Sequence, residues 1–149
     1  MPHDGFHPDL EPGPATTRNR VRVVRSSELD ADTAQSEGMQ RFAAISAGAV
    51  GSEKLWMGET RVQPHTVSAN HHHGEAETAI FVRSGHPDFV FRDGEREVRI
   101  STGPGDYVFI PPYLPHREEN PSASQPAVVV VARSTQEAIV VNLPKLYPL

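Results

Sequence analysis

The chain has 149 residues, a formal net charge of −5 and no cysteine, and it is long enough to bury one ordinary core. The lack of cysteine excludes disulfides, zinc fingers and cysteine nucleophiles, so histidine, carboxylate and hydroxyl groups must carry any chemistry. The charges are dispersed, so we expect a small-molecule partner and no nucleic acid. The sequence shows no membrane helix and no signal peptide, which predicts a soluble, cytoplasmic protein.

The first part of the chain is poor in large apolar side chains. Residues 1–19 contain several prolines and cannot offset their ordering entropy by burial, so we expect a flexible N-terminal arm followed by a single domain over 20–149. Residues 20–25 (RVRVVR) have the β-branched composition of an edge strand. Residues 26–38 are polar, with a helical turn expected at Ser27 or Asp30.

From residue 39 onward the sequence shows the pattern of a β protein, with short apolar segments bounded by turn residues. Strands are predicted at 39–46, 55–63, 71–74, 78–83, 87–92, 95–100, 107–111, 116–120, 127–133 and 138–143. Asp93-Gly94 lies between two alternating runs, which indicates a hairpin. No amphipathic helix of ten or more residues competes. Many short strands predict a sandwich or a barrel, and a small barrel can enclose one ligand in its mouth.

Three consecutive histidines stand directly before an apolar segment. In a strand, His71 and His73 project to one face while His72 projects to the other. Two imidazoles on one face can share a metal ion, which normally needs a third and often a fourth protein ligand. The alternative is a solvated surface loop, because histidine clusters also occur on protein surfaces.

The remaining candidates for the site are carboxylates and one later histidine. His116 and Glu77 are the candidate third and fourth ligands beside His71 and His73. Glu75 and Glu118 are candidate catalytic acid/base groups, or acceptors for the second N–H of a ligating histidine. As solvated rim residues they would have no catalytic role.

The stretch at 105–120 resembles the second motif of the cupin superfamily. Gly105, Pro111, His116 and Asn120 match that motif at every spacing. Tyr113 stands where the motif has a turn glycine, so we expect a turn of different shape there.

The stretch at 65–85 resembles the first cupin motif, with one ambiguity. His71, His73 and Gly85 match it, and His65 stands where its opening glycine would be. Counted forward from His73, the glutamate of the motif falls on Glu77. Counted back from Gly85, it falls on Thr78. A β-bulge at 77–78 would aim Glu77 inward, and we favour this prediction because bulges are enriched beside active sites. Without a bulge, the three histidines alone would bind the metal.

This resemblance, which covers roughly residues 40–143, implies an all-β double-stranded β-helix (jelly-roll) barrel. It also implies a divalent metal ion (Zn, Fe, Mn or Ni) in the barrel mouth and a metal-dependent enzyme of small-molecule metabolism. With iron it implies oxygenase chemistry. With zinc it implies redox-neutral chemistry such as isomerisation, lyase activity or an N–N bond-forming rearrangement. A non-catalytic ligand-binding cupin remains an alternative.

A homodimer is also expected. The segments 20–25 and 127–134 carry more apolar surface than one inner face of a barrel can use.

Overall fold

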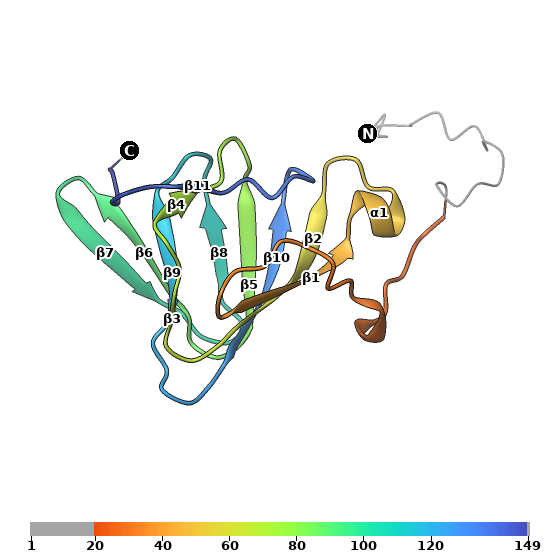
Figure 1. Cartoon of the computed structure of the whole chain (residues 1–149), viewed down its shortest axis with the longest axis horizontal. Coiled ribbons are helices and arrows are strands. Elements are labelled where there is room, and N and C mark those ends of the chain that lie inside the picture. The colour runs from red at the N-terminus through yellow and green to blue at the C-terminus, as the bar shows by residue number, and fades with distance from the viewer. Residues whose placement is uncertain (1–19, 149) are drawn as a thin grey trace, which may run out of the picture.

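The computed structural model describes residues 20–148, which form two antiparallel sheets that face each other (Figure 1). The five-stranded sheet has the order β1-β2-β10-β5-β8, and the six-stranded sheet runs β11-β4-β9-β6-β7 with β3 paired to β9. The strands are β1 (Met39–Ile45), β2 (Trp56–Val62), β3 (Thr66–Val67), β4 (His71–His72), β5 (Thr78–Ser84), β6 (Asp88–Asp93), β7 (Arg96–Ser101), β8 (Tyr107–Ile110), β9 (His116–Asn120), β10 (Ala127–Arg133) and β11 (Val141–Asn142). The predicted all-β jelly-roll class is confirmed.

The N-terminal part of the domain departs from the prediction. Residues 20–25 form no strand, and Val21 is 94% exposed, because no sheet edge lies beside this segment to accept its hydrogen bonds. The expected helical turn occurs as a 3₁₀ turn at Ser26–Glu28. The glycine-containing loop after β1 holds a short helix, α1 (Ala47–Val50), whose first turn is capped by the Ser46 hydroxyl. The arm predicted at 1–19 lies outside the described residues.

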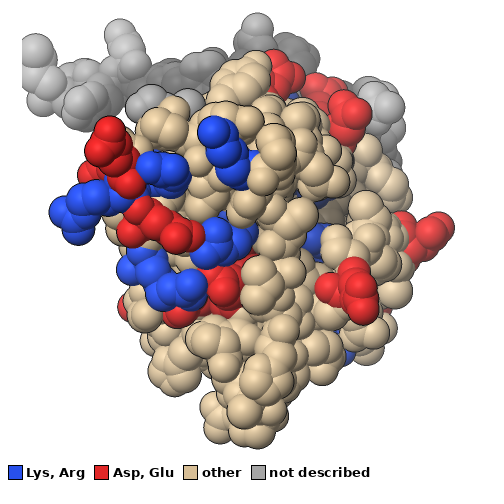
Figure 2. Space-filling model, turned by 60° about the vertical axis from the view of Figure 1, so that its left-hand side comes forward, with Lys and Arg blue, Asp and Glu red and all other residues tan. Residues whose placement is uncertain are grey.

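A hairpin joins β6 to β7, as the Asp93-Gly94 pair predicts. Asp93 pairs with Arg96, and Gly94 has a positive φ of 61°, a conformation that glycine adopts without steric cost. Acidic and basic side chains are intermingled around these strands (Figure 2). Arg99 contacts Asp88 and Glu119 at 3.0 and 2.8 Å, so neither sign of charge forms an extended field there. No helix in residues 20–148 is long and apolar enough to cross a membrane.

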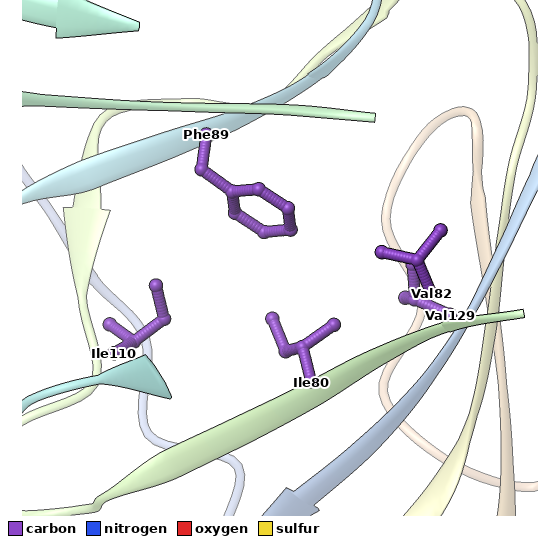
Figure 3. Packing of buried hydrophobic residues seen from close by; sticks show 5 residues of the cluster. All are labelled: Ile80, Val82, Phe89, Ile110 and Val129. Carbon is purple, nitrogen blue, oxygen red and sulfur yellow. The ribbon is translucent and has the colours of Figure 1, made fainter. Parts of the chain in front are cut away.

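The apolar core lies between the two sheets and is built by side chains that alternate along each strand. Its main cluster consists of Ile80, Val82, Phe89, Ile110 and Val129 (Figure 3). Burial of each such side chain stabilises the fold by about 1.5–3 kcal/mol. Along β5, Val82 belongs to this core, whereas Thr78 lines a cavity. The inner face of β5 therefore runs from a filled core at its end to a cavity at its beginning.

Candidate metal centre

Three imidazoles and one carboxylate converge in that cavity. The candidate ligand atoms of His71, His73, His116 and Glu118 all lie within 4.8 Å of one another. The ring centroids are 4.5 Å apart for His71 and His116, 4.8 Å for His71 and His73, and 5.0 Å for His73 and His116. This spacing is close enough for a single ion to reach all three rings.

Strand pairing brings these residues together. His71 on β4 lies directly opposite His116 on β9, and Glu118 follows two residues later on the same face of β9. Asn120, on that face again, is fully buried and donates to three backbone carbonyls, including the Val62 carbonyl at 3.1 Å. These bonds fix the far end of β9 and thereby the position of His116 and Glu118.

The backbone selects one tautomer at all three histidines. Each Nδ1 lies within hydrogen-bond distance of a carbonyl oxygen: 2.6 Å from His71 to Ala69, 2.9 Å from His73 to Ile139 and 2.9 Å from His116 to Leu114. A carbonyl oxygen can only accept, so each Nδ1 must carry the proton. The Nε2 atoms are then left with free lone pairs, which is the state that a metal ligand requires.

Burial favours the uncharged form of His73 and His116. It lowers the pKa of His73 to about 4 and also lowers the pKa of His116, while neighbouring imidazoles act in the same direction. Within residues 20–148, the buried Nε2 of His116 has no hydrogen-bond partner. An orphaned acceptor of this kind costs about 1–3 kcal/mol. A bound metal ion would satisfy it, so the donor set fits the metal cofactor that the sequence implies.

The structure corrects the expected role of Glu77. Its side chain is exposed, whereas Thr78 is buried and lines the cavity. The expected bulge at 77–78 is absent, because Thr78 pairs in regular register with Arg133 and with Ile110. The register shift in β5 lies at the opposite end of the strand, beside Ser84. The carboxylate next to the imidazoles is instead that of Glu118, whose Oε1 lies 3.9 Å from Nε2 of His116.

Two other residues of the histidine stretch lie away from the cluster. Glu75 is exposed in the turn after His73 and does not line the cavity, so the structure does not support its predicted catalytic role. His72 faces the other way, as predicted: its Nδ1 accepts the Gly74 N–H at 2.9 Å, and its ring centroid lies 5.8 Å from that of Tyr113.

Two positions at which the motifs have glycine keep a glycine-like backbone in this chain. His65 and Tyr113 have positive φ angles of 58° and 61°. No other non-glycine residue among those described has a positive φ. The expected change of turn shape at Tyr113 is therefore wrong, because the residue adopts the left-handed conformation that glycine would adopt.

The cavity has a volume of about 520 Å³ and is lined by both sheets and by the segments 33–37 and 138–142. This volume suits a small organic ligand. Three of its side chains, those of Arg41, Trp56 and Arg133, were not predicted to belong to the site. Alternation along β10 through Val129 could have placed Arg133 on the inner face, but not the presence of a cavity there.

Comparisons with known proteins agree with the fold. Residues 58–133 match the family model of the cupin domain. The fold is similar to the polyketide cyclase RemF from Streptomyces resistomycificus (TM-score 0.68, 23% identity, 83% of this chain and 86% of that chain). It is also similar to an oxalate decarboxylase from Lactobacillus farciminis (TM-score 0.64, 17% identity, 76% of this chain and 34% of that chain). A third similar structure is an oxalate oxidase in complex with glycolate (TM-score 0.61, 18% identity, 72% of this chain and 56% of that chain). No curated protein matches the sequence.

Proposed function

We propose that this chain, which belongs to the cupin family, is a metal-dependent enzyme that binds a small-molecule substrate at a divalent ion in the mouth of its barrel. One observation carries the proposal: the candidate ligand atoms of the three histidines lie within 4.8 Å of one another, and each Nδ1 is hydrogen-bonded to a backbone carbonyl, which leaves each Nε2 free to bind an ion. A histidine cluster without metal would gain nothing from leaving the Nε2 of His116 buried and unpaired.

His71, His73 and His116 would supply the neutral ligands of this ion, and Glu118 the charged one. This gives Glu118 a ligand role in place of the acid/base role expected from the sequence. Imidazole and carboxylate ligands suit zinc, iron, manganese and nickel. When bound, such an ion supplies Lewis-acid polarisation of a substrate oxygen.

The surrounding residues would orient the substrate and exclude water. Thr78 lines the cavity, at the position where the glutamate of the first motif falls when it is counted back from Gly85. Ile80 and Val131 form an apolar wall behind it, which strengthens electrostatic interactions at the site. Residues 33–37 and 138–142 also line the cavity, and the Ile139 carbonyl accepts the Nδ1–H of His73.

Redox-neutral chemistry is the reaction class that we favour. The similarity to a protein described as a polyketide cyclase covers most of both chains, whereas this chain spans about a third of the oxalate decarboxylase. Metal-assisted isomerisation or cyclisation of a chelating small molecule is the proposal that follows.

The proposal is tested by metal analysis of untagged protein. Samples equilibrated separately with Zn²⁺, Fe²⁺, Mn²⁺ and Ni²⁺ are desalted and measured by mass spectrometry for metal per chain. We expect one ion per chain, its loss in His116→Ala, and its retention in His72→Ala, a neighbouring histidine that faces away. Equal metal content in the two variants would contradict the proposed ligand set.

A further inference from the structure

We propose that the cavity contains a second subsite, formed by Arg133, Trp56 and Arg41, that binds the anionic group of a planar organic substrate. This inference rests on the proposed function in one respect, which is that the cavity is an active site. The anion subsite itself is inferred from the contacts of Arg133, Trp56 and Arg41, none of which is a proposed metal ligand.

Arg133 is the centre of this subsite. It is the last residue of β10, and in the sheet it lies between Trp56 of β2 and Thr78 of β5. Its guanidinium carbon lies 3.9 Å from the centroid of the Trp56 ring, which is a cation–π contact. The Trp56 ring takes the space above Gly58, because a Cβ there would lie 2.5 Å from the ring. Glycine at this position therefore lets the aromatic platform form.

The hydrogen bonds of Arg133 orient its charge but do not neutralise it. Nε donates to the Thr135 carbonyl at 3.1 Å, and Nη2 donates to the Gln136 carbonyl at 2.9 Å. Among the residues that the structure describes, no carboxylate lies within ion-pair distance of this guanidinium. Partial burial and the nearby charge of Arg41 lower the pKa of Arg133 to about 10, which still leaves it fully charged at neutral pH.

Arg41 adds a second positive charge to the same cavity. It donates to the Ser36 hydroxyl at 2.9 Å, and within residues 20–148 it too has no carboxylate partner. Two acidic residues also line the cavity: Glu118, which lies with the imidazoles, and Glu37, which is exposed at the rim. Neither is within ion-pair distance of Arg41 or Arg133.

Several arginines elsewhere in this fold are paired with acids. Arg61 and Arg83 share Glu59 at 3.0 and 2.6 Å, and Arg99 and Arg117 share Glu119 at 2.8 and 3.2 Å. Arg92 and Arg96 also lack an acidic partner among residues 20–148, so what distinguishes Arg41 and Arg133 is that both line one cavity. A partly desolvated positive charge is costly without a counter-ion, and a substrate anion would supply one.

The chemistry of the lining defines the class of ligand. Trp56, Ile80 and Val131 give the cavity an apolar lining, and the guanidinium group of Arg133 matches a carboxylate or phenolate. The metal centre lines the same cavity. A substrate that fits both parts is an aromatic anion that carries a second oxygen group for the metal.

The test uses benzoate as the anionic probe and benzamide as its uncharged isostere. Trp56 is the only tryptophan, so its fluorescence reports on this cavity directly. We expect benzoate to bind at least tenfold more tightly than benzamide, and Arg133→Gln to abolish that preference. Arg41→Gln should weaken benzoate binding in the same direction. Arg61→Gln is the matched control, because Arg61 also lies over an aromatic ring, that of Phe42 at 4.5 Å, but outside the cavity.

Each titration is performed on zinc-loaded protein and on protein stripped with a chelator. This separates benzoate bound by arginine from benzoate bound by metal. Equal affinity of the stripped protein for the two probes, or unchanged benzoate affinity in Arg133→Gln, would overturn the inference. If Arg133→Gln does not fold, Arg41→Gln decides. Failure of the wild-type chain to bind any of Zn²⁺, Fe²⁺, Mn²⁺ and Ni²⁺ would contradict the proposed function, while the titrations of stripped protein would still decide the anion subsite.

Discussion

His71 and His116 lie directly opposite each other in the pairing of β4 with β9, and their ring centroids are 4.5 Å apart. β4 is only two residues long, so few backbone hydrogen bonds hold it against β9. An ion shared by the two imidazoles would therefore clamp a short strand to the sheet that carries it. Metal binding should then contribute to stability as well as to chemistry.

Metal removal is the first test of this relationship. A ligand present at about 100 times its dissociation constant stabilises the folded state by about 2.7 kcal/mol. We expect zinc to raise the melting temperature of the wild-type chain by about 5–11 °C, since each kcal/mol shifts the melting temperature of a domain of this size by about 2–4 °C. Calorimetry with and without chelator measures the shift, which His116→Ala should eliminate. A shift of the same size in that variant would place the ion elsewhere.

The second prediction separates two glutamates. Glu118→Gln should weaken metal retention markedly, because it removes the only charged oxygen among the clustered ligand atoms. Glu77→Gln should leave metal content unchanged, because Glu77 is exposed and does not line the cavity. Dialysis against graded chelator concentrations measures both. If Glu118→Gln retains the ion and shifts only the pH profile of turnover, Glu118 is an acid/base group and not a ligand.

The third prediction concerns pH and the metal-free protein. Burial holds the pKa of folded His73 at about 4, below its ordinary value of 6.5, so the unfolded chain takes up a proton first as pH falls. The contribution of His73 to the free energy of unfolding should be constant above pH 6.5. It should decrease as the pH falls from 6.5 to 4. Urea unfolding across this range should show a smaller decline for His73→Gln than for wild type. His72→Gln, the outward-facing control, should keep the wild-type slope.

The fourth prediction uses the left-handed residue His65. A side chain in this left-handed conformation costs about 1–2 kcal/mol. Replacement by glycine removes this strain, but the greater flexibility of glycine in the unfolded chain offsets part of the gain. His65→Gly should therefore raise the free energy of unfolding by about 0.5–1 kcal/mol. His65→Ala is the control, since alanine keeps the strained backbone. Chemical denaturation should rank glycine above alanine, and the reverse order would show that His65 is not strained.

The fifth prediction is the homodimer, for which the structure offers a different surface from the one first expected. β8 is an edge strand, and its Tyr107 and Phe109 are 82% and 58% exposed. Tyr107 packs against Phe81 of β5, which extends the apolar surface. Light scattering at micromolar concentration should give the mass of a dimer, and Phe109→Glu should give that of a monomer. A monomeric wild type would refute the prediction.

The sequence determined the strands and the facing of the histidines because both depend on local alternation. Within a strand, neighbouring side chains point to opposite faces, so His71 and His72 must face opposite ways. The hairpin at Asp93-Gly94 is equally local, because a two-residue turn with a positive φ needs only the right residues. The same reasoning fails at residues 20–25, since β propensity makes a strand only where a sheet edge accepts its hydrogen bonds.

Tertiary structure alone decided which carboxylate stands beside the imidazoles. Strand alternation could not predict the face of Glu77 from that of His73, because β4 ends at His72 and a turn follows at 74–75. The alternation of side chains does not continue through such a turn. Glu118 reaches the cluster only because β9 pairs with β4, a contact between distant segments. The Arg133 subsite has the same origin: alternation directs its side chain inward, but only the packing of two sheets leaves a cavity there in place of a core.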